Sequence, residues 1–165
     1  MAKKQQEKDI KKSSTEEEVK KGTAYYQAIG RRKEATSRVR LYVVSDSEIT
    51  ISGITLKKGD MYVNGKAIEK YFPGEISKHM YLEPFRTTNT IGRYAVTAHV
   101  EGSGPQGQLG AFILGVSRAF EKIDKEKFRP ILKKKGFLTR DPRQKERRKA
   151  GNAQKARAKK QSPKR

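Results

Sequence analysis

The sequence predicts a two-layer α+β domain that is followed by a long basic tail. Short apolar–polar alternations between residues 25 and 100 predict strands. A stretch with apolar residues at steps of three and four, typical of an amphipathic helix, comes after them. From Lys133 onward the chain holds fifteen Lys or Arg and two acids. Because the strands precede the helix, we expect the helix to cover one face of the sheet.

Composition points to a polyanionic partner. The 165 residues include 39 Lys or Arg and 18 Asp or Glu, which gives a formal net charge of +21. Such an excess favours nucleic acid, an anionic membrane surface or an acidic protein as partner. The length suits one domain with tails. We expect a disordered leader over residues 1–23, a globular domain over 24–132 and a basic tail over 133–165 that binds a polyanion.

Residue types and patterns that the sequence lacks exclude several classes of protein. The chain has no cysteine, which excludes disulfides, cysteine-ligated zinc and thiol catalysis and fits a reducing compartment. No apolar run approaches the roughly 20 residues of a membrane span, so we expect no membrane partner. Residues 1–23 are charged and lack the apolar stretch of a secretory signal. These features predict a cytoplasmic protein.

The first predicted strands occupy residues 25–44, with an interruption at residues 30–33. The second half of this segment alternates. Its predicted apolar face holds Val39, Leu41 and Val43, and its largely basic face holds Arg38, Arg40 and Tyr42. Residues 48–52 predict a short strand. The next residues, 53–60, predict a hairpin excursion that leads into a strand over 61–63.

A turn and two helices are predicted in the middle of the chain. Asn64–Gly65 is a turn sequence, and residues 66–72 then favour a helix that ends at Pro73–Gly74. The segment 76–90 is ambiguous. A helix within it is expected to break at Pro84, because proline lacks the backbone N–H.

The clearest elements follow this segment. Regular alternation over residues 93–100 predicts a strand, and a Gly-rich turn separates it from the main helix. The apolar stripe of that helix consists of Leu109, Phe112, Ile113, Val116, Phe120 and Ile123. A second, short helix is predicted to begin near Pro130 and to end at Gly136.

Residues 102–107 read G-S-G-P-Q-G, a G-x-G-x-x-G motif between a strand and a helix. One interpretation is a dinucleotide site, which needs a following parallel strand with an acid about 20 residues on. The residue at that distance, Asp124, closes the helix, and a Lys-rich stretch follows. We therefore favour an RNA backbone phosphate at the helix N-terminus over a nucleotide cofactor. A plain tight turn is the remaining alternative.

The tail is predicted to be disordered when alone in water, because it lacks apolar surface and its charges repel each other. Asp141–Pro142–Arg143–Gln144 has the form of a helix start, and Gly151 that of a helix end. The enclosed stretch is too short to be stable alone, and its like charges at i,i+4 repel. Phosphates would neutralise these charges, so the tail needs a dense polyanion.

Catalytic patterns are weak in this sequence. His79 and His99 have no acid–base partner pattern, and Glu75 and Glu83 lack metal-ligand spacing. No nucleophile elbow or zinc-protease motif occurs. We expect no catalytic residue, no metal and no cofactor. Three tyrosines are candidates either to stack on bases or to pack in the domain: Tyr25, Tyr26 and Tyr42.

Five ordered motifs resemble the family of small-subunit ribosomal protein nine, and they cover about Tyr25 to Arg165. The motifs are Tyr26–Ala35 with its G-R-R-K, Val63–Lys66 with Tyr71–Phe72 soon after, the Gly-rich turn and helix over 102–120, Gly136–Arg143, and Glu146–Lys149 with the terminal Lys164–Arg165. Two parts of the chain depart from the family pattern. Residues 158–163 lack the usual aromatic residue, and residues 1–23 and 53–60 look like additions.

The resemblance implies a structural constituent of the head of the small ribosomal subunit, not an enzyme. It implies a domain like the second domain of ribosomal protein five, with helices on one face of a mixed four-stranded sheet. The implied partners are 16S rRNA, the anticodon stem-loop of the P-site tRNA and neighbouring ribosomal proteins of the head. No homo-oligomer is expected.

The candidate RNA-binding residues are the basic and Gly-rich positions of these motifs. For rRNA they are Arg31, Arg32, Lys33, Arg38, Gly102, Gly104, Gln106, Gly107, Gln108, Arg118, Arg140, Arg143, Lys145, Arg147, Arg148, Lys149, Lys155, Arg157, Lys159 and Lys160. For tRNA, the resemblance implies Lys164 and Arg165, which would contact the stem-loop backbone. Two alternatives remain: a free nucleic-acid-binding or chaperone protein, and a nucleotide-binding enzyme that uses the Gly-rich turn.

Overall fold

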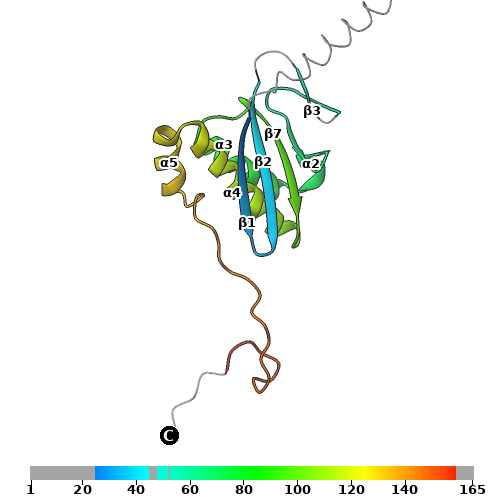
Figure 1. Ribbon diagram of the computed structural model, residues 1–165, viewed down its shortest axis with the longest axis vertical. Helices are drawn as coiled ribbons and strands as arrows, with labels where there is room; N and C mark the ends of the chain where they lie inside the picture. Colours follow the sequence, from blue (N-terminus) through cyan, green and yellow to red (C-terminus); the bar gives the residue numbers. More distant parts are fainter. Residues whose placement is uncertain (1–24, 45–47, 52, 159–165) are drawn as a thin grey trace, which may run out of the picture.

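The computed structural model describes residues 25–44, 48–51 and 53–158. It shows a mixed α+β domain in which helices cover one face of a mixed sheet (Figure 1), as the sequence predicts. The strands are β1 (Tyr25–Arg32), β2 (Ala35–Val43), β3 (Ile49–Ile51), β4 (Ile54–Leu56), β5 (Met61–Val63), β6 (Lys66–Ala67) and β7 (Tyr94–Glu101). The helices are α2 (Ile68–Tyr71), α3 (Glu75–Thr87), α4 (Pro105–Ile123) and α5 (Lys125–Lys134).

Among the described residues the main sheet has five strands in the order β1-β2-β7-β5-β6, so the expected number of four is wrong. The pair β5–β7 is parallel, and the other pairs are antiparallel. The extra strand, β6, occupies residues predicted to begin a helix. Asn64 and Gly65 both have positive φ angles, 49° and 77°. A two-residue turn of this kind closes a hairpin, and α2 begins only after it.

The predicted interruption at residues 30–33 lies two residues later, because β1 continues through Gly30 to Arg32. The chain turns at Lys33–Glu34, and Lys33 has a φ of 52°. Gly30 is needed for the packing of α4 against β1, and not for a turn of the chain. A Cβ atom there would lie 1.9 Å from the carbonyl oxygen of Ala111 in α4. The helix therefore rests directly on the strand backbone.

The larger core lies between α4 and the sheet. The predicted stripe of α4 is confirmed, with four of its residues buried and two partly buried in this core. Phe120 is at the centre of an aromatic group, with ring centroids 5.2 Å from Phe85, 5.7 Å from Tyr94 and 5.5 Å from Phe128. Burial of these large rings ties α3, β7 and α5 to α4.

A second, smaller core lies on the other face of the sheet. Tyr42, Val44, Leu56 and Ala95 are buried in it, and apolar residues of the β3–β4 hairpin pack against them. The prediction that Tyr42 belongs to an exposed basic face and Val43 to the core is therefore wrong. Tyr42 is 2% exposed and Val43 is 53% exposed. The burial of Tyr42 is caused by the hairpin, which covers the outer face at this end of β2.

Two helices differ from their predictions. Helix α3 continues through Pro84, where a break was expected. Tyr81 and Phe85 on either side of this proline are buried in the core, and their burial offsets the roughly 3 kcal/mol cost of an internal proline. Helix α5 begins at Lys125, well before Pro130. The Asp124 carboxylate accepts a hydrogen bond from the N–H of Lys127 at 3.0 Å and caps the helix.

Substitution Gly30→Ala tests the contact between α4 and β1. The new methyl group has no space beside the backbone of Ala111, so we expect the free energy of unfolding to fall by about 3 kcal/mol. Urea denaturation of the purified chain measures this change as a lower midpoint with an unchanged m-value. The control is Gly104→Ala, whose Cβ atom meets nothing within 4 Å. A loss in this control as large as that of Gly30→Ala would contradict the packing argument.

Candidate nucleic-acid interface

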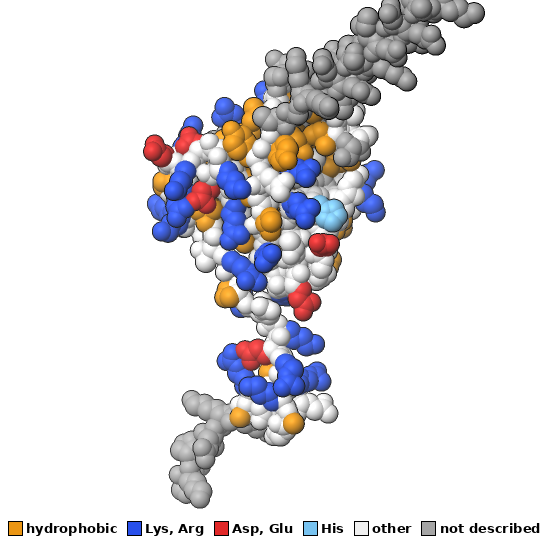
Figure 2. All heavy atoms as spheres, in the orientation of Figure 1, with side chains coloured by type: hydrophobic (Ala, Val, Ile, Leu, Met, Phe, Trp, Pro, Cys, Tyr) orange, Lys and Arg blue, Asp and Glu red, His pale blue; other side chains and the backbone are white. Residues whose placement is uncertain are grey.

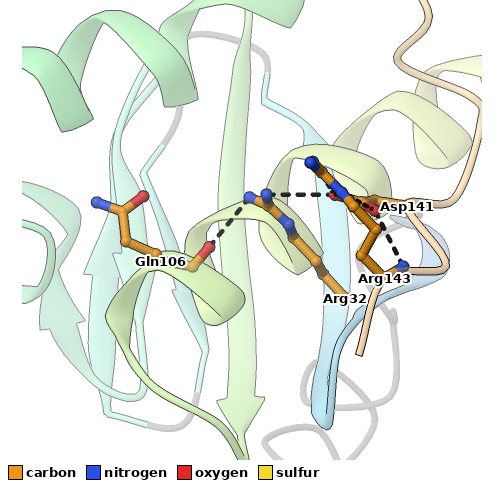
Figure 3. A network of polar contacts seen from close by, with 4 residues as sticks. All are labelled: Arg32, Gln106, Asp141 and Arg143. Atoms are coloured by element: carbon orange, nitrogen blue, oxygen red, sulfur yellow. Dashed lines mark hydrogen bonds and ion pairs between the residues drawn. The ribbon is translucent and has the colours of Figure 1, made fainter. Parts of the chain in front are cut away.

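One end of the domain brings together the end of β1, the first turn of α4 and the beginning of the tail. Arg32 joins all three (Figure 3). Its Nη1 donates to the carbonyl oxygen of Gln106 at 3.4 Å, and its Nη2 lies 3.3 Å from Oδ2 of Asp141. We call Arg32, Gln106, Asp141 and Arg143 the tail junction. Both partners of the ion pair are about one-quarter exposed, at 26% each.

Asp141 holds the first residues of the tail in a local turn. Its carboxylate accepts hydrogen bonds from the backbone N–H of Arg143 at 3.1 Å and from the guanidinium of that residue at 2.9 and 2.8 Å. These bonds, together with the charge of Arg32, hold the pKa of the Asp141 carboxyl well below its usual range. No helix forms over residues 141–149. This agrees with the expectation that the stretch is too short to be helical alone.

The Gly-rich turn has a packing role. Cβ atoms at Gly102 and Gly107 would lie 2.5 Å from the Glu34 carbonyl oxygen and 2.6 Å from the Ser103 hydroxyl oxygen. The Gln108 side chain is bonded internally, because it accepts from the Tyr71 hydroxyl at 3.0 Å and donates to the Gly102 carbonyl at 3.1 Å. Within the described residues, α4 leads into α5 and not into a strand. A dinucleotide site would need that strand.

The predicted rRNA-binding residues fall into three places. Those at the tail junction and beside it are Arg31, Arg32, Lys33, Gly102, Gly104, Gln106, Gly107 and Gln108, of which Gly107 is buried. The exposed tail cations are Arg140, Arg143, Lys145, Arg147, Arg148, Lys149, Lys155 and Arg157. Figure 2 shows Lys and Arg gathered along this part of the chain. Arg38 and Arg118 lie elsewhere on the domain. Lys159, Lys160, Lys164 and Arg165 lie outside the described residues.

Arg118 lies along β1, which is an edge strand of the sheet among the described residues. Its Nη1 donates to the carbonyl oxygen of Ile29 at 2.9 Å, and Lys122 Nζ donates to that of Gln27 at 2.7 Å. The two cations therefore cover part of an edge strand, which would otherwise offer unpaired backbone groups. Lys122 was missed in the sequence, although its spacing of four residues from Arg118 places both on one side of α4.

Two residues of the outer sheet face were also left out of the predicted site. Arg40 and His99 share this face with Arg38, since Arg38 is opposite His99 in the β2–β7 register. The alternation of β2 could have indicated Arg40. Nothing local links His99 to it. In the part of the chain that the structure describes, no helix is long and apolar enough to cross a membrane, and no three His, Asp or Glu gather as for a metal.

These features define a class of protein: a small mixed α+β domain with a basic extension joined to it by an ion pair. The chain belongs to the ribosomal protein S9/S16 family, because the sequence model of that family matches residues 30–165. The resemblance drawn from the motifs is thereby confirmed.

Curated relatives agree with this assignment. Proteins named small ribosomal subunit protein uS9 from Leifsonia xyli subsp. xyli and Cutibacterium acnes are 45% and 44% identical to this chain over 124 residues, which are 75% of it. The matched regions cover 66% and 64% of these two relatives. The chain therefore spans a little under two thirds of their length.

Substitution Asp141→Asn tests the tail junction. Neutral Asn cannot form the ion pair with Arg32, so we expect trypsin to cleave after Arg140 and Arg143 several-fold faster than in the unchanged chain. The lowered carboxyl pKa means that the pairing is complete above the ordinary value of about 4 and is lost only in stronger acid. Neutral digestion conditions therefore report the intact junction.

The control is Glu146→Gln, which removes the same charge from the tail. Glu146 pairs with Arg157 at 2.9 Å and makes no contact with Arg32 among the described residues. We expect cleavage after Arg140 to be unchanged in this control. Equal acceleration in both variants would show that lost negative charge, and not the junction, explains the result.

Proposed function

We propose that this protein is a structural constituent of the small ribosomal subunit and binds its rRNA without catalysing a reaction. The supporting observation is that a folded domain continues into a cationic segment whose described part, residues 140–158, is largely exposed. Residues 141–149 have no helix or strand, and Figure 1 shows this part of the chain leaving the domain. The family assignment and the names of the relatives support the choice of a ribosomal partner.

The tail is suited to closely spaced phosphates. Its two acids are already paired within the chain, Asp141 with Arg32 and Arg143, and Glu146 with Arg157. Each acid therefore offsets the charge of only the cations next to it. A phosphate elsewhere along the tail meets cations that no acid offsets. The folded domain sets the position of the protein on the RNA, and the tail supplies the positive charge that closely packed RNA phosphates require. We expect the tail to become ordered only when phosphates neutralise it.

The finer assignment follows the family resemblance. We propose 16S rRNA in the subunit head as the main partner, with neighbouring ribosomal proteins around the domain. Lys164 and Arg165 are proposed to contact the backbone of the P-site tRNA anticodon stem-loop. Contacts to the backbone carry no base information, so these two residues would serve every tRNA. The proposed location is the cytoplasmic ribosome.

Sedimentation separates this function from a free nucleic-acid-binding protein. We expect the tagged chain to co-sediment with small subunits in a sucrose gradient and to remain with them through a moderate salt wash, because surrounded charges are screened less. A chain that stays at the top of the gradient, or that leaves the subunits at low salt, would favour the free protein instead.

Tail cations should determine the salt dependence of RNA binding. We expect the combined substitution of Arg143, Lys145, Arg147 and Arg148 by Gln to reduce the slope of log affinity against log salt by about 3, since each phosphate contact contributes roughly 0.7–0.9. Filter binding of rRNA across a salt series measures the slope. The control exchanges four exposed domain lysines for Gln: Lys58, Lys66, Lys70 and Lys125. An equal loss of slope in both variants would mean that net charge alone governs binding.

Deletion of Lys164 and Arg165 should leave subunit assembly intact and weaken P-site tRNA binding, because two phosphate contacts are removed. Binding of tRNA to purified variant subunits measures the effect. Replacement of Lys159 and Lys160 by Gln removes the same charge and is the control. Unchanged tRNA affinity after the deletion, or an equal loss in the control, would count against a role of the last two residues.

A further inference from the structure

The outer face of the sheet carries a groove of about 520 Å³ that is separate from the tail junction. We call it the outer groove. Its residues come from β2, β5, β7, the β3–β4 hairpin and the β5–β6 turn: Arg38, Arg40, Ile51, Ile54, Tyr62, Asn64, Gly65, Thr97, Ala98 and His99. The volume is within the range of sites for small ligands. No acid is among these residues.

The two arginines of the outer groove differ in how they are held. Arg40 is fixed, because its Nε donates to Oε1 of Gln27 at 3.1 Å and its guanidinium lies 5.2 Å from the ring centroid of Tyr25. Its terminal N–H groups have no acceptor among the described residues. The Arg38 side chain is exposed and has no hydrogen bond or ion pair in the same part of the chain. The two side chains are about 7 Å apart along β2 and face the same way.

The opposite wall is apolar. Ile51 and Ile54 belong to the hairpin that packs on the second core, and Tyr62 is partly buried against the same core. The turn at the other side is fixed by the Asn64 side chain. This side chain donates to the carbonyl oxygen of Val100 at 2.7 Å and accepts from the N–H of Val100 at 2.8 Å. The wall is therefore preformed.

We propose that the outer groove binds one unpaired nucleotide of an RNA strand. Its phosphate would lie on Arg38 and Arg40, and its base would lie against Tyr62 and the isoleucine wall. A ligand that joins a strong anion to a flat apolar ring matches this pairing of arginines with an aromatic wall. RNA offers such units in loops and bulges, where bases are unstacked. The inference rests on the proposed rRNA binding and adds a second contact to it.

The β3–β4 hairpin is essential to this proposal. It supplies the isoleucine wall, and part of it belongs to the segment 53–60 that departs from the family pattern. Without it, Arg38 and Arg40 would be two cations on a flat sheet. The proposal thus assigns a function to a segment that looks like an addition to the family pattern: the segment converts a basic surface into a site for a single nucleotide.

Ultraviolet crosslinking inside purified small subunits tests the site. Tyr62 lies in the tryptic peptide 59–66 between Lys58 and Lys66. We expect mass spectrometry to find a nucleotide adduct on this peptide in the unchanged chain and in Tyr62→Phe, which keeps the ring. In the double variant Arg38→Ala, Arg40→Ala the adduct should fall about tenfold or more, because charge-assisted hydrogen bonds contribute on that scale.

The matched control is Arg93→Ala, which removes an exposed arginine that does not line the outer groove, and its adduct should match that of the unchanged chain. Each single substitution, Arg38→Ala and Arg40→Ala, is included in case the double variant unfolds, and each should also lower the adduct. Adducts on tail peptides but none on 59–66 would overturn the outer groove alone, as would an equal loss in the Arg93 control. Absence of the chain from small subunits would instead overturn the proposed function.

Discussion

The contact between α4 and β1 places two backbones against each other with no side chain between them. Gly30 makes this possible on the strand, and Gly115 on the helix, where a Cβ atom would lie 2.7 Å from Val39. Close approach brings the end of β1 over the first turns of α4. The stem of Arg32 then lies on Gly110, where a Cβ atom would be 2.3 Å from its Cδ. Arg32 can therefore reach both the helix and Asp141, and the tail leaves the domain at a fixed point.

Electrostatics divides the chain into two kinds of basic surface. Cations of the domain are partly committed to the fold, because Arg32, Arg118 and Lys122 donate to backbone carbonyls. Cations of the tail are largely exposed, and the ion pair of Glu146 with Arg157 joins two exposed side chains, so it contributes little stability in water. A polyanion therefore meets cations held in place by the fold at the domain, and cations free to pair with phosphates in the tail. The domain sets the position of the protein on the polyanion, and the tail contributes most of the affinity.

The sequence was informative where one local pattern decided the structure. The stripe of α4 and the alternation of β7 are such patterns. It failed where a contact with a distant segment decided. Gly30 resembles a turn residue until α4 is known to lie on it, and Pro84 resembles a helix break until the burial of Phe85 is known. The tail cations of the candidate site could be read directly. Its junction could not, because Arg32 and Asp141 are far apart in the sequence.

Burial of Tyr42 links the failed prediction on β2 to the outer groove. Alternation predicted one basic face along the whole strand, but the β3–β4 hairpin covers its far end and buries Tyr42 beside Leu56. The same hairpin brings Ile51 and Ile54 into the lining of one groove with Arg38 and Arg40. Apolar side chains of the hairpin and cationic side chains of β2 therefore line the same groove, because the hairpin ends before it covers the two arginines. A hairpin long enough to cover Arg38 would bury unpaired charge at high cost, and a shorter one would leave Tyr42 exposed.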